Sequence, residues 1–154
     1  MTTDALWDDR WLQLAVHIGR WSKDRSRQVG CVIVGSANQI LSAGYNGFAR
    51  GVDDTSDERH ARPAKYDWTE HAERNAIYNA ARTGIALEGA TMYLPWFPCA
   101  ACARAIVQVG LEMLVAVRPT AEDTQWDEQF EISELLLQEG GVKVRLVASE
   151  HVLT

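Results

Sequence analysis

The chain has 154 residues, of which 47% are hydrophobic and 23% are charged, a composition typical of a soluble globular protein. Aspartate and glutamate number 21 against 15 lysines and arginines, so the net charge is −6. This balance disfavours a protein that binds nucleic acid through a basic face. The sequence shows no basic N-terminal segment followed by an apolar run, and no stretch of roughly 20 apolar residues. We therefore expect no signal peptide, no membrane partner and a cytoplasmic location.

The length fits a single domain covering 1–154. The first predicted element is an amphipathic helix at 4–22, where apolar side chains recur every three or four residues. A polar loop at 22–27 follows. Its cations and hydroxyls fit either a solvated connection, which the composition favours, or an anion site. The apolar run 29–34 predicts a buried strand that forms a hairpin with a second strand at 40–43.

The segment 49–68, called the flap below, is polar and has no clear periodicity. A segment of roughly 20 such residues is long for a compact domain and is commonly functional or disordered. We interpret it as a flap over a site or as an insertion at an interface. It contains His60, which fits a surface histidine better than a metal ligand.

The remaining predicted elements alternate between helix and strand. The helices are expected at 69–82, 98–110 and 126–138, and the strands at 91–94, 113–117 and 142–146. We expect Thr69 to cap the first of these helices and Gly84 to end it in the left-handed conformation. A hairpin followed by alternating strands and helices predicts an α/β protein. The expected fold is a three-layer α/β/α sandwich with a mixed, largely parallel, five-stranded sheet.

Two short motifs at the starts of predicted helices carry the chemistry. His71 and Glu73 form an H-x-E motif, and Pro98, Cys99 and Cys102 form a P-C-x-x-C motif. Zinc binds imidazole nitrogen and thiolate sulfur tetrahedrally, and a catalytic zinc site has three protein ligands and an open position for water. His71, Cys99 and Cys102 would be the three ligands, and Glu73 would remain to move protons.

A redox pair and a structural zinc site are the alternatives to a catalytic zinc site. A Cys-x-x-Cys motif alone fits a redox pair, and a structural site is usually closed by a fourth cysteine or histidine. Cys31 is the only further cysteine, and in a predicted central strand it fits a small core hydrophobe. The combination of both motifs favours a catalytic site, in which zinc lowers the pKa of its bound water and Glu73 takes the proton.

The sequence resembles the deoxycytidylate (dCMP) deaminases of the cytidine deaminase superfamily, whose zinc members share the H-x-E and P-C-x-x-C motifs. The resemblance extends from Trp21 to about Val147. The stretches that carry it are 22–24, 28–30, 44–47, 51–54, 71–77 and 97–103. The first four of these stretches point to the deoxycytidylate branch, whereas the zinc motif is common to the superfamily.

The resemblance implies hydrolysis of dCMP to dUMP and ammonia. It assigns His71, Cys99 and Cys102 as ligands of Zn²⁺ and Glu73 as the proton shuttle. It also implies a homo-oligomer that binds a small nucleotide substrate and no nucleic acid. Many members of the family are hexamers that dCTP activates and dTTP inhibits, so both nucleotides are expected effectors.

The resemblance also implies contacts with the substrate. Asn46 is expected to help hold the nucleoside, and Ala72, between the two residues of the H-x-E motif, is expected to line the site. The polar loop is expected near the phosphate, with Ser22, Lys23 and Arg25 as its binding residues. Family members often have proline where this chain has Arg25, and the added cation could alter nucleotide preference.

Two other functions remain open. One is deamination of another nucleoside, nucleobase or nucleotide, such as cytidine, a modified base or adenosine in tRNA; the negative net charge argues against tRNA. The other is a zinc-binding assembly domain without turnover. The presence of Glu73 argues against that second function, because a structural zinc site needs no general base.

Overall fold

The computed structural model of the chain describes residues 2–120 and 127–152. Five strands form one sheet in the order β2-β1-β5-β6-β7. Their bounds are β1 Gly30–Val34, β2 Ile40–Tyr45, β5 Thr91–Leu94, β6 Met113–Val117 and β7 Lys143–Val147. β1 is antiparallel to both β2 and β5, whereas β5, β6 and β7 are parallel. The mixed, largely parallel five-stranded sheet is confirmed, because only β1 is reversed and the other four strands point in the same direction.

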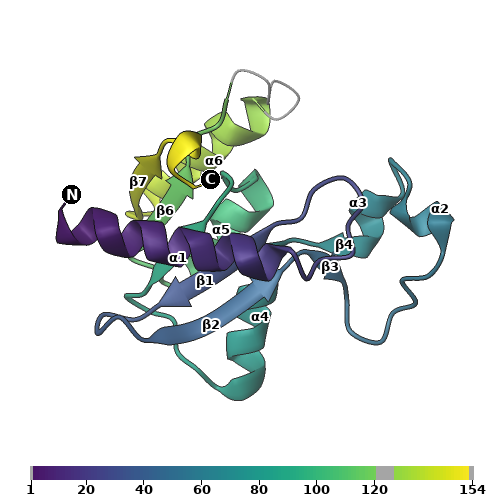
Figure 1. The fold of residues 1–154 in the computed structure, drawn as a ribbon, viewed down its shortest axis with the longest axis horizontal. Helices are drawn as coiled ribbons and strands as arrows, with labels where there is room; N and C mark the ends of the chain where they lie inside the picture. The colour runs from purple at the N-terminus through teal and green to yellow at the C-terminus, as the bar shows by residue number, and fades with distance from the viewer. Residues whose placement is uncertain (1, 121–126, 153–154) are drawn as a thin grey trace.

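Helices cover both faces of the sheet, as Figure 1 shows. α1 (Thr3–Gly19) lies across one face, and α4 (Ala72–Thr83), α5 (Ala100–Gln108) and α6 (Asp127–Glu139) cover the other. Successive strand residues face opposite layers. Cys31 and Ile33 join the core beneath α4 and α5, whereas Val32 joins the core beneath α1. The three-layer α/β/α sandwich is thus confirmed, and Cys31 is fully buried as a core hydrophobe.

Two helix boundaries differ from the sequence prediction. α1 ends at Gly19 rather than at residue 22. The backbone of Gly19 packs on that of Gly30, so that a Cβ on Gly19 would lie 2.8 Å from the Gly30 nitrogen. The prediction that Thr69 caps α4 is wrong. Thr69 begins β4 (Thr69–Glu70), which pairs with β3 (Gly47–Phe48), and the N-cap of α4 is His71.

The other helix ends agree with the sequence patterns. Gly84 ends α4 in the left-handed conformation, with φ of 71°. In the third predicted helix, Trp126 lies outside the described residues, and α6 begins at Asp127. A 3₁₀ turn, η2 (Ser149–His151), follows β7.

The flap contains two single-turn helices, α2 (Asp57–His60) and α3 (Lys65–Trp68), and extends beyond the sheet in Figure 1. Three ion pairs join it to the polar loop at 22–27. They are Lys23–Asp54 and Arg25–Asp57, each at 2.7 Å, and Lys65–Asp24 at 3.0 Å. The loop and the flap therefore form one connected wall. In the part of the chain that the structure describes, no helix has the length and apolarity needed to cross a membrane.

α4 packs directly against the backbone of β2 at Gly44. A Cβ on Gly44 would lie 2.4 Å from the backbone nitrogen of Ala76 and 2.7 Å from the carbonyl oxygen of Ala72. The Asn75 side chain also donates a 2.9 Å hydrogen bond to the carbonyl of Tyr45. These contacts fix where α4 begins relative to the edge of the sheet.

We expect Gly44→Ala to lower the free energy of unfolding by about 1–3 kcal/mol or more, because the added methyl group meets backbone atoms that cannot rotate away. Gly47→Ala is the matched control, since nothing lies within 4 Å of its added Cβ. Urea unfolding of both variants checks the prediction. Equal midpoints for Gly44→Ala and the unmodified protein would show that β2 and α4 do not depend on this close approach.

Candidate metal centre and active site

The two zinc motifs meet because α4 and α5 begin at the same edge of the sheet. α4 runs away from this edge, β5 returns to it, and α5 starts there. His71 is the N-cap of α4 and Cys99 is the N-cap of α5, with Cys102 in the first turn of α5. This is the edge where the parallel strands β5 and β6 end, the position at which open α/β sheets commonly bind ligands.

The three predicted ligands have the spacing of a tetrahedral zinc site. His71 Nδ1 lies 3.5 Å from Cys99 Sγ and 3.4 Å from Cys102 Sγ. Zn–N and Zn–S bonds of about 2.0 and 2.3 Å at tetrahedral angles place nitrogen and sulfur roughly 3.5 Å apart. Among the described residues, these three side chains are the one group of its kind placed to hold a metal ion. The donor set therefore fits zinc.

The electrostatics of the three side chains favour a thiolate on Cys99, whereas the hydrogen bond to Cys99 and burial raise the pKa of Cys102. A hydrogen bond from Cys102, supported by one from His71, lowers the pKa of Cys99 to about 3. The same contact with Cys99 raises the pKa of His71. Both cysteines also lie at the N-terminus of α5, where the helix dipole stabilises negative charge. These contacts prepare the site for a cation.

Glu73 lies beside this centre and is almost completely buried, with 4% of its surface exposed. Burial raises the pKa of Glu73, and the neighbouring His71 opposes that shift. A raised pKa makes a carboxyl group hold a proton more readily, so that the group can act as an acid as well as a base. This is the behaviour that a general acid–base residue needs.

The first turn of α4 is held by a second carboxylate. Glu70 accepts a hydrogen bond from the backbone N–H of His71 at 3.0 Å and one from Arg74 Nε at 2.6 Å. The carboxylate thereby ties the residue before the helix to its first turn. Glu70 positions His71, and it does not belong to the group of residues that could hold a metal.

A cavity of about 110 Å³ opens onto the centre, and His71, Glu73 and Cys99 line its inner end. Its other charged lining residues are Asp24, Arg27, Arg62 and Lys65, and its aromatic lining residues are Tyr66, Trp96, Phe97 and Phe130. These side chains come from the polar loop, the flap, the segment after β5, and α6. The cavity therefore combines a chemically reactive end with aromatic walls and a cationic side.

Two of the five predicted substrate-binding residues line this cavity, Asn46 and Ala72. The amide of Asn46 is also a structural contact, because Oδ1 accepts from the Val29 backbone and Nδ2 donates to the Arg27 carbonyl, both at 2.8 Å. Ser22 is not among the lining residues. It is buried, and its hydroxyl donates a 2.7 Å hydrogen bond to the Asn46 carbonyl.

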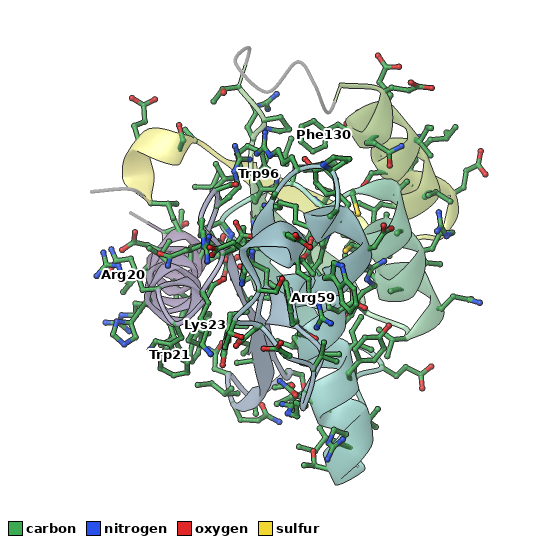
Figure 2. All side chains as sticks on the ribbon, turned by 90° about the vertical axis from the view of Figure 1, so that its right-hand side faces the viewer. Arg20, Trp21, Lys23, Arg59, Trp96 and Phe130 are labelled. Carbon is green, nitrogen blue, oxygen red and sulfur yellow. The ribbon has the colours of Figure 1, made fainter. Side chains whose placement is uncertain are left out.

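Lys23 and Arg25 are also not among the residues that line the cavity. Both are exposed, and each is paired with a flap carboxylate, Asp54 and Asp57 respectively. In Figure 2, Lys23 lies well apart from Trp96. The structure therefore places these two cations outside the lining of this cavity, where they bind the flap.

Sequence reasoning missed a buried ion pair in the wall of the cavity, Asp24–Lys65 at 3.0 Å. Asp24 also accepts hydrogen bonds from the backbone N–H groups of Ser26 and Arg27. Burial alone would raise the pKa of Asp24, but these amides and Lys65 outweigh it and lower the pKa. This turn was recognisable from the sequence Asp-Arg-Ser-Arg, because an aspartate side chain commonly accepts a hydrogen bond from the backbone N–H two residues later. No local pattern pointed to Lys65 in the irregular flap.

A second missed feature is the stack of Arg27 on Trp96. The guanidinium carbon lies 3.6 Å from the centroid of the indole ring. Trp96 in turn contacts Phe130 edge-on, with 6.2 Å between ring centroids. The position of Trp96 two residues before Pro98 was the available signal, since it places the side chain near the metal centre.

Comparison with known proteins agrees with this site. The family model described as cytidine and deoxycytidylate deaminase zinc-binding region matches residues 5–118, so the chain belongs to this family. The deoxycytidylate deaminase of Homo sapiens is 32% identical over 144 residues, covering 90% of this chain and 78% of the relative. An uncharacterised deaminase in the luxG 3' region of Aliivibrio fischeri is 40% identical over 139 residues, covering 90% and 91%.

A solved structure shares the fold. The dCMP deaminase of cyanophage S-TIM5, crystallised with dCMP and dUMP, superimposes with a TM-score of 0.76 at 21% identity, covering 96% of this chain and 99% of that one. Family membership makes the present chain a zinc-dependent deaminase, and His71, Cys99 and Cys102 are placed to bind its metal.

We expect Cys99→Ala and Cys102→Ala to lose bound zinc. Removing a side chain that only hydrogen-bonds to a metal ligand lowers metal affinity by roughly 10–100-fold, and removing a ligand itself should lower it further. Cys31→Ala is the matched control, because Cys31 is a buried core residue outside the ligand group. It should retain one zinc per chain. Zinc content after gel filtration measures all three variants, and retained zinc in Cys99→Ala would contradict the assignment.

Proposed function

We propose that the chain hydrolyses dCMP to dUMP and ammonia. The observation that carries the proposal is the buried carboxyl of Glu73 beside a donor set that fits zinc, at the inner end of a cavity. The relatives named deoxycytidylate deaminase, with 32% identity over most of the chain, support the choice of substrate.

In this reaction Glu73 carries the protons. His71, Cys99 and Cys102 would hold the zinc ion, which would supply a water molecule with a pKa lowered toward neutrality. Glu73 would accept a proton from the attacking water as the water oxygen adds to the ring carbon that bears the amino group. Glu73 would then pass this proton to the ring nitrogen. It would next take the proton of the new hydroxyl group on that carbon and pass it to the departing amine. The carbon–nitrogen bond breaks, a carbonyl forms at that carbon, and ammonia leaves.

The apolar part of the cavity suits the base. Val29, Ala72 and Phe97 line it next to the metal centre. The position of Asn46 in the same lining supports the proposal that Asn46 and Ala72 contact the nucleoside. Burial of Glu73 excludes bulk water from the proton transfers. The contacts of Ser22, Lys23 and Arg25 support a role in holding the loop and the flap together.

We extend the proposal to organisation and regulation. The chain would form one domain over 1–154, act in the cytoplasm and assemble as a homo-oligomer with dCTP and dTTP as effectors. The resemblance to the family supports the effectors. Exposed apolar side chains on the edge strand and on α4, namely Ile40, Tyr45 and Tyr78, support assembly, since such side chains are commonly covered by a second subunit.

We expect Glu73→Gln to retain zinc and to lower kcat on dCMP by about 10²–10⁴-fold, because the amide cannot transfer the proton. Glu134→Gln, at an exposed position on α6, is the matched control and should keep full activity. Ammonia release and zinc content are measured on the same samples. Undiminished turnover by zinc-loaded Glu73→Gln would exclude Glu73 as the proton shuttle.

A further inference from the structure

The two cysteines of the metal centre are also placed to bond to each other. Cys99 is the N-cap of α5 and Cys102 lies in its first turn, which a 2.9 Å hydrogen bond from the Ala103 backbone N–H to the Cys99 carbonyl closes. Their sulfur atoms belong to a group whose ligand atoms all lie within 4.8 Å of one another. Cys-x-x-Cys motifs form disulfides in oxidoreductases, so this backbone arrangement can accept the bond.

The third cysteine of the chain is kept apart from this pair. Cys31 lies on β1, is fully buried, and packs in the core beneath α4 and α5. It does not belong to the group of side chains placed to hold a metal ion. Cys102 is therefore the cysteine that the structure places beside Cys99.

The two sulfurs differ in their access to solvent. Cys99 is partly exposed and lines the cavity, whereas Cys102 is fully buried and is not among the lining residues. The cavity of about 110 Å³ has room for a molecule as small as hydrogen peroxide. Oxidation of cysteine follows the exposure of its sulfur. An oxidant in the cavity therefore meets Cys99 first, with Cys102 behind it as the second thiol.

We propose that Cys99 and Cys102 form a reversible redox switch, in which a peroxide that enters the cavity links them in a disulfide and zinc is released. This switch is a property of the metal ligands and goes beyond deamination. The protection by a nucleotide that is described below rests on the proposed function.

The reaction balances as a two-electron oxidation of the two thiolates. The Cys99 sulfur attacks one oxygen of the peroxide and breaks the O–O bond, which gives a sulfenic acid and hydroxide. The Cys102 sulfur then attacks the Cys99 sulfur, the S–O bond breaks, and a second hydroxide leaves. Two protons from solvent convert the hydroxides to water. A dithiol reductant reverses the oxidation by exchange and becomes a disulfide itself.

The disulfide removes two of the three ligands. His71 alone would remain, whereas a catalytic zinc site needs three protein ligands. Oxidation would therefore empty the metal centre and stop catalysis without damage to the core. Because Cys99 lines the same cavity as Glu73, a nucleotide bound there would cover the route to its sulfur. The switch would then act on chains that have no substrate bound.

The test adds hydrogen peroxide to the zinc-loaded full chain and measures zinc release, free thiols and disulfide-linked peptides in the same samples. We expect zinc release to parallel the loss of two of the three free thiols, with a bond between Cys99 and Cys102. A dithiol reductant followed by zinc should restore the zinc content. Cys31→Ala is the matched control and should release zinc at an unchanged rate.

Three results would overturn the switch. They are zinc retention with all thiols free, zinc release with cysteine sulfinic or sulfonic acids in place of a disulfide, and a disulfide that includes Cys31. Cys102→Ala tests the second thiol, in comparison with the zinc-free unmodified protein. Peroxide should convert Cys99 of the variant to a sulfinic acid that a dithiol does not reduce, whereas the unmodified protein should recover both thiols.

Protection by dUMP separates the switch from the proposed function. With dUMP at about ten times the dissociation constant measured by calorimetry, zinc release should slow about tenfold, because the fraction of unoccupied sites falls by that factor. An unchanged rate with dUMP bound would overturn the cavity as the route to Cys99. If dUMP did not bind and dCMP were not turned over, while peroxide still formed the disulfide, the proposed function would fail and the switch would stand.

Discussion

The geometry of one metal ion constrains the whole structure. His71 and Cys99 are 28 residues apart in the sequence, yet a tetrahedral zinc requires their ligand atoms to lie roughly 3.5 Å apart. The fold meets this requirement by starting α4 and α5 at one edge of the sheet, with β5 as the return path. The close approach of β2 to α4 at Gly44 fixes the position of α4 along the sheet. The buried core beneath α4 and α5 holds the N-termini of these two helices next to each other.

A second set of interactions builds the wall of the cavity beside this centre. The polar loop and the flap are joined by three ion pairs, of which only Asp24–Lys65 is buried. Exposed pairs contribute little to stability, but here they engage Lys23 and Arg25 with flap carboxylates, outside the lining of the cavity. The arginine that remains toward the cavity, Arg27, is stacked on Trp96. An acidic protein thus retains a local positive site.

The sequence predicted the chemistry better than it predicted the recognition of the substrate. His71, Cys99 and Cys102 were recognisable because their residue types and local spacing define a ligand set, and Glu73 was recognisable from its place in the H-x-E motif. Capping by Thr69 was wrong because its backbone is drawn into pairing with β3, a tertiary contact that no local pattern shows. In the irregular loop, the contacts of each cation depend on carboxylates in the flap. The sequence therefore could not show that Lys23 and Arg25 bind the flap whereas Arg27 lines the cavity.

The most direct measurement of the central claim is dUMP formation from dCMP by the purified protein, before chelation, after chelation and after zinc is restored. We predict turnover by the zinc-loaded protein, loss on chelation and recovery with zinc, with dCMP preferred over deoxycytidine. If the folded, zinc-loaded protein left dCMP unchanged while releasing ammonia from cytidine, adenosine or guanine, the zinc chemistry would stand and the assignment of the substrate would be contradicted.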